Sequence, residues 1–182
     1  MGRCKVIGFM LSVVLVVGLW AAPAVLADEK PRRGGILNAA LAGDPPSLDM
    51  HQEQTFMVAQ PLGPVYNNLI VFDPHNYPQI IGDLAKSWTV SGDYLTYTFM
   101  LHEGVKFHDG SPFNADAFLW NWDKIRTKDA PQYDIKQAGI IHWATTEMKQ
   151  WRKLDDYTLE LITTRPSSFI PYLLTYIMMS SP

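Results

Sequence analysis

The sequence predicts an α/β fold, and residues 95–125 carry the clearest signals for it. Residues 95–101 alternate apolar side chains with threonines, which is the pattern of a half-buried strand. Residues 105–107 form a second extended piece. Asp109-Gly110 then predicts a tight turn, because glycine has no Cβ to clash at positive φ. A helix follows, so strands and a helix are expected to share one core.

The helix is predicted to begin after Asn114 and to continue through Ile125. Asn114 is a favourable N-cap, and Asp116 places a carboxylate in the first turn, at the positive end of the helix dipole. Apolar residues then recur at helical spacing and define one buried face: Phe118, Leu119, Trp122 and Ile125. Five aromatic side chains of this region are expected to be largely buried: Trp88, Phe99, Phe107, Phe113 and Trp122.

Outside this stretch, the chain offers shorter signals. Residues 36–41 predict a short apolar strand that opens at Gly34-Gly35. Residues 126–139 are polar and contain a proline, which predicts a loop or a broken helix. Residues 151–154 and 157–163 flank an Asp-Asp pair and predict a hairpin.

The first 27 residues have the pattern of a secretory signal peptide. Arg3 and Lys5 precede an apolar run, and small residues end the segment, which predicts cleavage after Ala27. An uncleaved membrane anchor is the alternative, but the run is short for a full span. Cys4 is the single cysteine and would leave with the peptide, so a periplasmic protein without disulfides is expected.

Composition and motifs argue against several function classes. The formal charge of −3 gives no footprint for nucleic-acid binding. GxSxG, Walker-type and GxGxxG patterns do not occur, so no enzyme activity and no cofactor are expected. The five histidines lack metal-ligand spacing, and no metal site is expected: His51, His75, His102, His108 and His142.

Several segments together resemble one bacterial family. GVKFHDGSPFNADAF, preceded by LAKSWTVSGDYLTYTFML, resembles the signature region of the family 5 extracellular solute-binding proteins, which serve ABC importers of peptides, dipeptides and nickel. GGILNAALAGDPPSLDMH, VYNNLIVFD and WRKLDDYTLELITTRP are similar to further segments of that family. By this resemblance, residues 52–73 form a helix followed by a strand. The helix is expected to start or kink at residues 61–64, where two prolines and a glycine occur.

The resemblance implies an N-terminal lobe of a type II-like periplasmic binding protein, with a mixed sheet core and an inserted α+β subdomain. It assigns residues 28–182 to the solute-binding protein, residues 34–50 and 164–182 to the core of the first lobe, and residues 51–163 to the insertion. The second lobe is expected beyond residue 182. An apolar patch is then expected to be exposed and to drive self-association: Leu173, Leu174, Ile177, Met178 and Met179.

The function that the resemblance implies is capture of a small solute and its delivery to an importer permease in the membrane. An oligopeptide or dipeptide is the expected solute, nickel chelates, glycosides and opines stay open, and the full-length form is expected to be a monomer. The resemblance places solute contacts at Gln54, Thr55 and Phe56, and at Met179 and Ser180. Core packing is the alternative role for Phe56. A sensor or interaction domain on the same fold is an alternative function, as is a secreted hydrolase, although no nucleophile motif supports the latter.

Overall fold

In the computed structural model, the structure describes residues 34–36, 38–53 and 55–182. The chain divides into two compact units, Met1–Ala39 and Ala40–Pro182, and the helices and strands named below belong to the second. The predicted signal peptide and its cleavage after Ala27 lie outside the described residues. Across the part that is described, none of the helices has the length and apolar character needed to cross a membrane.

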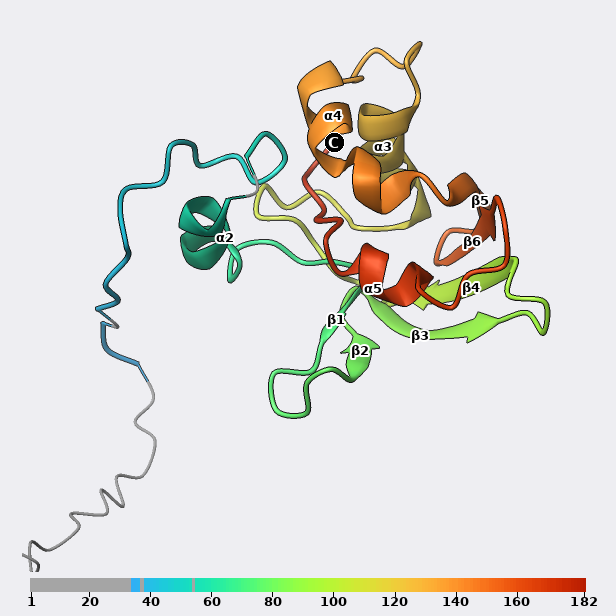
Figure 1. Cartoon of the computed structure of the whole chain (residues 1–182), viewed down its shortest axis with the longest axis horizontal. Helices are drawn as coiled ribbons and strands as arrows, with labels where there is room; N and C mark the ends of the chain where they lie inside the picture. Colours follow the sequence, from blue (N-terminus) through green and yellow to red (C-terminus); the bar gives the residue numbers. More distant parts are fainter. Residues whose placement is uncertain (1–33, 37, 54) are drawn as a thin grey trace, which may run out of the picture. The chain divides into compact units, whose positions relative to one another are not determined.

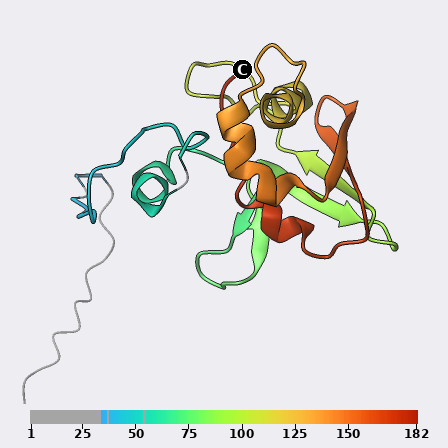
Figure 2. The same cartoon turned by 45° about the horizontal axis from the view of Figure 1, so that its top comes forward.

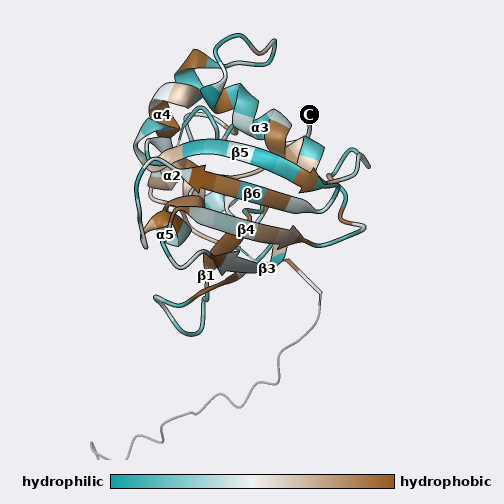
Figure 3. Ribbon diagram, turned by 90° about the vertical axis from the view of Figure 1, so that its right-hand side faces the viewer, coloured by the Kyte–Doolittle hydropathy of each residue, from teal (hydrophilic) through white to brown (hydrophobic). Residues whose placement is uncertain are grey.

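A four-stranded antiparallel sheet forms the centre of the second unit. Its strands are β3 (Ala85–Val90), β4 (Thr96–Leu101), β5 (Met148–Asp155) and β6 (Thr158–Thr163), and their spatial order is β3-β4-β6-β5 (Figure 3). In β4 the aromatic and leucine side chains are buried while the threonines between them are half-buried, as the alternating sequence predicts. The strand predicted at residues 95–101 and the hairpin predicted around the Asp-Asp pair are both confirmed.

A second, two-stranded sheet pairs β1 (Ile70–Phe72) with β2 (Ile80–Gly82) in antiparallel register. The strand expected within residues 52–73 is therefore confirmed. Backbone hydrogen bonds tie the start of β3 to the residues that precede β1. The N–H groups of Leu84 and Ala85 donate to the carbonyls of Asn68 and Leu69. The two sheets are thus joined by a short connection.

Helix α3 (Ala115–Arg126) covers the inner face of the four-stranded sheet. The side chain of Asn114 accepts a hydrogen bond from the N–H of Ala117 at 3.0 Å, so the predicted cap is confirmed. The apolar face of the helix meets Trp151 of β5, with ring centroids 4.5 Å apart for Phe118 and 6.1 Å apart for Trp122. Burial of this face therefore holds the helix to the sheet.

Helix α4 (Ile135–Thr145) lies beside α3. In Figure 2, α3 is the helix seen nearly end-on. Its N-cap is Asp134, whose carboxylate accepts from the N–H groups of Lys136 and Gln137. The loop or broken helix predicted for residues 126–139 is therefore wrong for its last part. The reason is local, because a carboxylate at an N-cap position satisfies the free N–H groups of the first turn.

The five aromatic residues expected in the core divide into two groups. Phe99, Phe113 and Trp122 are buried, as expected. Trp88 and Phe107 are partly buried and pack against the same core. Trp88 stacks on Phe99 with ring centroids 6.5 Å apart, so it borders the core that it was expected to fill.

Two expectations for the residues that precede β1 are wrong. Residues 38–41 are in no strand, and none of the β-pairings among the described residues includes them. Helix α2 (Phe56–Leu62) begins before the proline and glycine cluster of residues 61–64 and ends within it, instead of starting or kinking there. Pro61 is tolerated in its last turn, and the N–H of Gly63 closes the helix on the carbonyl of Ala59 at 2.8 Å.

The exposed apolar patch expected near the last described residues is also wrong. After α5 (Ile170–Leu174), the chain runs back along the residues that precede β1 (Figure 1). The N–H of Met179 donates to the carbonyl of Asn67 at 3.0 Å, and Met178 forms an isolated antiparallel bridge with Asn68. Four of the five side chains are buried, and Met178 is half-buried: Leu173, Leu174, Ile177 and Met179 are the buried ones.

Candidate functional site

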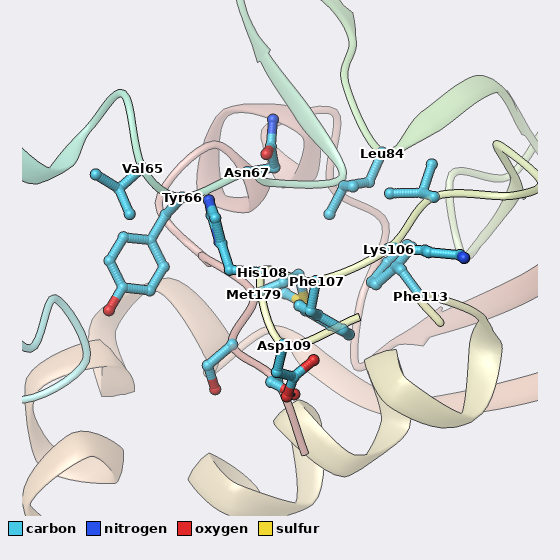
Figure 4. A pocket seen from close by; sticks show the side chains of 13 residues that line it. Val65, Tyr66, Asn67, Leu84, Lys106, Phe107, His108, Asp109, Phe113 and Met179 are labelled. Carbon is cyan, nitrogen blue, oxygen red and sulfur yellow. Dashed lines mark hydrogen bonds between the residues drawn. The ribbon is translucent and has the colours of Figure 1, made fainter. Parts of the chain in front are cut away.

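A cavity of about 310 Å³ opens on the second unit, between the chain that precedes β1, the turn that precedes α3, and the last described residues (Figure 4). Its walls are mainly apolar and carry a few polar side chains. Thirteen residues line it: Val65, Tyr66, Asn67, Leu84, Val105, Lys106, Phe107, His108, Asp109, Phe113, Met179, Ser180 and Ser181. Apolar walls with a few polar groups are typical of a site for a small ligand.

The wall formed by residues 105–113 is a tight hairpin. Phe107 and Ser111 share a backbone hydrogen bond of 2.9 Å, and the N–H of Phe113 donates to the carbonyl of Val105 at 2.9 Å. Gly110 has a φ of 88°, which a residue with a Cβ seldom adopts. The rings of Phe107 and Phe113 meet edge to face at 5.7 Å. The sequence therefore builds a rigid wall from one turn and two aromatic residues.

Asp109 is the acidic side chain of the cavity. One carboxylate oxygen accepts from the N–H of Ser111 at 2.8 Å and from its hydroxyl at 2.6 Å, and the other oxygen accepts from the hydroxyl of Ser181. Hydrogen bonds from the side chains of Ser111 and Ser181 and from the backbone lower the pKa of Asp109 to about 2. Asp109 therefore stays ionised near neutral pH.

Asn121 binds the backbone of Ser180, the residue that precedes the serine bound to Asp109. This buried side chain on α3 donates from Nδ2 to the carbonyl of Ser180 at 2.8 Å and accepts from the N–H of Ser180 at 2.9 Å. The amide group thus pairs with the backbone of Ser180 as a neighbouring strand would. Asn121 and Asp109 together hold residues 180 and 181 in the cavity wall.

A much smaller cavity, of about 20 Å³, lies behind this segment beside His51. The Nε2–H of His51 donates to the carbonyl of Met178 at 3.0 Å. Burial of the ring, together with the nearby Lys124 ammonium, lowers the pKa of His51 from its usual value. The side-chain oxygen of Gln137 lines this space and has no hydrogen-bond partner in the structure. His51 therefore serves as a neutral clasp on the segment that carries the larger cavity's wall.

The residues predicted to contact a solute fall into three groups. Met179 and Ser180 line the larger cavity. Thr55 and Phe56 are exposed, Phe56 by 85%, and neither lines that cavity. Gln54 lies outside the described residues. The exposure of Phe56 argues against its alternative role in core packing, while the predicted solute contacts of all five residues stay predictions.

Sequence reasoning missed the residues that shape the cavity. Asp109 was interpreted as a turn residue, which is correct, but its contact with Ser181 joins residues 72 positions apart. Asn121 was passed over on a helix chosen for its apolar face. An amide on the otherwise apolar side of α3 was the available signal, because buried amides need partners. Within the described ranges, no cluster of three or more His, Cys, Asp or Glu residues could hold a metal ion.

The fold is similar to that of solved solute-binding proteins. A dipeptide binding protein from Pseudoalteromonas sp. SM9913, solved in complex with Met-Leu, superposes with a TM-score of 0.66 at 20% identity, over 76% of this chain and 30% of that chain. At this identity the likeness establishes the fold, which is that of the type II periplasmic binding proteins. The expected mixed α/β fold class is confirmed.

Sequence comparison narrows the class to a family. Residues 79–182, more than half of the chain, match the bacterial extracellular solute-binding proteins, family 5, in their middle region. The chain therefore belongs to this family, whose members are periplasmic. This matched part contains most of the cavity walls, from Leu84 to Ser181.

Two curated relatives show how far the likeness extends. The dipeptide-binding protein of Escherichia coli (strain K12) is 30% identical over 115 residues, which cover 58% of this chain and 21% of the relative. A glutathione-binding protein of Pectobacterium atrosepticum is 41% identical over 103 residues, which cover 57% of this chain and 18% of the relative. The chain thus spans about a fifth of the length of these two relatives.

Proposed function

We propose that the chain supplies part of the solute-binding component of an ABC importer, which captures a small solute outside the cytoplasm and delivers it to a membrane permease. The observation that carries the proposal is that the part of the chain matching the family also builds most of the cavity walls. The proposal includes export through the predicted signal peptide and no bond-making step. The division into residues 34–50 and 164–182 as lobe core, with residues 51–163 inserted, remains part of it.

A short peptide is the solute class that the relatives favour. Two relatives at 30% and 41% identity are named for a dipeptide and for glutathione, which is itself a small peptide. A third relative, also at 30% identity, is named for haem, and one solved neighbour holds Fe(III)-EDTA, so the family accepts several ligand shapes. The carboxylate of Asp109 disfavours an anionic metal chelate in this cavity.

Uptake measurements test the proposal in the bacterium that carries the gene. Deletion of the gene is expected to abolish uptake of one labelled solute from a panel of dipeptides, tripeptides and glutathione. Restoring the complete gene is expected to restore that uptake, and genes for a permease and an ATPase are expected beside it. Unchanged uptake across the panel would contradict an import role.

The same strains separate import from the sensor alternative. A sensor would leave uptake intact and change gene expression in response to the solute, since it transmits a signal and moves no cargo. Loss of transcriptional response with normal uptake would therefore favour a sensor. Mass spectrometry of the periplasmic product is expected to find Asp28 at the amino terminus, and a membrane-retained species beginning at Met1 would contradict the predicted cleavage.

A further inference from the structure

We propose that His51 makes the attachment of residues 49–52 sensitive to pH. This loop packs against α3, α4 and the segment after α5 while the His51 ring is neutral, and it detaches when the ring takes up a proton. The proposal goes beyond solute capture, because it concerns a change of conformation that requires no solute. Since the loop precedes α2, its release also changes where that helix can lie.

Three consecutive residues attach the loop. Met50 is buried, with only 2% of its surface exposed. The ring of His51 donates from Nε2 to the carbonyl of Met178 at 3.0 Å. The side-chain amide of Gln52 donates to the carboxylate of Asp134 at 3.4 Å. The titratable ring therefore lies at the centre of the attachment, between a buried apolar side chain and a second hydrogen bond.

The titratable and charged groups around the ring come from five parts of the chain. Burial of the ring and the ammonium of Lys124 lower the pKa of His51, whereas two carboxylates and the carbonyl of Met178 act in the opposite direction. The lowering influences prevail, so the attached ring takes up a proton less readily than a free histidine does. The groups are Asp49 in the loop, Tyr66 before β1, Lys124 on α3, Asp134 at the start of α4 and Tyr176 after α5.

The small cavity beside the ring leaves little room to hydrate a charged imidazolium in place. Its volume is about 20 Å³, and a cavity needs about 10–15 Å³ to hold a single water molecule. Three apolar side chains on its walls offer no hydrogen bonds: Ile125, Ile141 and Ile177. A protonated ring regains its hydration by leaving this position, because a cation is costly to keep in partly apolar surroundings.

The direction of the pH effect follows from proton binding. Because the pKa of His51 is lowered in the attached state, the detached loop binds more protons. Attachment is therefore strongest above the ordinary histidine value of about 6.5 and weakens as the pH falls below it. The weakening ends below the lowered pKa of the attached ring, where both states are protonated. Uptake of one proton changes the attachment equilibrium by at most about tenfold per pH unit.

Oxidation of methionine by hydrogen peroxide tests the proposal on the full chain, with mass spectrometry of the peptides as the readout. The thioether has no titratable group, so its rate of conversion to the sulfoxide reports access of the reagent. Met50 is expected to react at least about threefold faster at pH 5 than at pH 7, since one proton drives detachment. Met148, which is buried in β5, should stay protected, and Met57, which is 41% exposed, should react at both pH values.

Variants assign the effect to the ring. His51→Gln keeps a side-chain N–H that can donate to the carbonyl of Met178 but cannot take up a proton in this range, so its Met50 rate should be equal at both pH values. His75→Gln is the matched control, because His75 is an exposed histidine outside the loop, and it should keep the full response. Lys124→Met removes a cation that opposes protonation and should reduce the response, whereas the exposed Lys128→Met should leave it unchanged.

Three outcomes would overturn the proposal: equal Met50 rates at both pH values in the unaltered chain, a full pH response in His51→Gln, or a parallel rise at Met148, which would mean that acid loosens the whole unit. A titration by nuclear magnetic resonance gives a reading that needs no variant. The ring signals of His51 should titrate at lower pH in the folded chain than in the urea-unfolded chain. Equal titration in both states would remove the basis for the coupling.

Discussion

The aromatic core and the larger cavity use the same helix in different ways. Trp122 of α3 points into the core against Trp151, while the preceding residue, Asn121, points at the backbone of Ser180. Aromatic rings in contact fill the core, whereas the cavity is an open space whose wall at Ser180 is held by the hydrogen bonds of Asn121. Adjacent positions on one helix therefore separate stability from site geometry, and substitutions at each should have different consequences.

The largest expected effect is in the core. Trp122→Ala should lower the free energy of unfolding by about 3–5 kcal/mol, because it leaves a cavity beside Trp151. Urea denaturation measures this loss, with Trp143→Ala as the control, since Trp143 is 50% exposed. If Trp122→Ala fails to fold, Trp122→Phe gives a smaller loss in the same direction. A loss below about 1 kcal/mol would show that the core does not depend on this ring.

Loss of the hydrogen bonds between Asn121 and Ser180 should have an intermediate effect. Asn121→Ala removes the partners of both backbone groups of Ser180 and should lower the free energy of unfolding by about 1–3 kcal/mol. Amide hydrogen exchange at residues 178–181 should accelerate more than exchange in β4. Equal acceleration in both places would mean that Asn121 supports the whole fold and has no special role at the cavity.

The hydrogen bonds accepted by the Asp109 carboxylate should make a smaller contribution to stability, which an acid titration of unfolding should reveal. The pKa of Asp109 is lowered from 3.8 to about 2, so the stability that the carboxylate contributes is present above 3.8 and is lost as the pH falls through about 2. Asp109→Asn should therefore remove part of the stability decline over that interval. An acid limb that is unchanged by this substitution would contradict the hydrogen bonds assigned to the carboxylate.

The smallest stability effect is expected at the exposed residues of α2. Phe56→Ala should change the free energy of unfolding by less than about 0.5 kcal/mol, because the side chain is 85% exposed. If Phe56 contacts solute as predicted, the same substitution in the complete importer protein should weaken solute binding by more than about tenfold at an unchanged melting temperature. A large loss of stability with normal solute binding would instead place Phe56 in the core.

The sequence alone predicted what local chemistry determines. The cap at Asn114, the turn at Gly110 and the alternation in β4 depend on neighbours in the chain, and each was found where expected. Helix α4 was largely missed because its apolar residues do not gather on one face, and Ile135 at its start is 78% exposed.

Contacts between distant residues account for most of the remaining errors. The apolar residues after α5 were expected to be exposed, because nothing in their own sequence shows that the chain before β1 covers them. The cavity depends on a carboxylate and a hydroxyl 72 residues apart. Periodicity and capping rules describe neighbours along the chain, so they identify the elements of this site without showing that the elements meet.

The return of residues 178–181 to earlier parts of the chain also sets an order of events during folding. Their partners include His51, Asn68, Asp109 and Asn121, at sequence separations from 59 to 127 residues where hydrogen bonds join them. Contacts of such long range form slowly and only after the chain has been synthesised through residue 181. The β3–β4 and β5–β6 hairpins and α3 can form earlier from local pairs, so we expect the larger cavity to be assembled late and to remain open to chaperones or proteases until then.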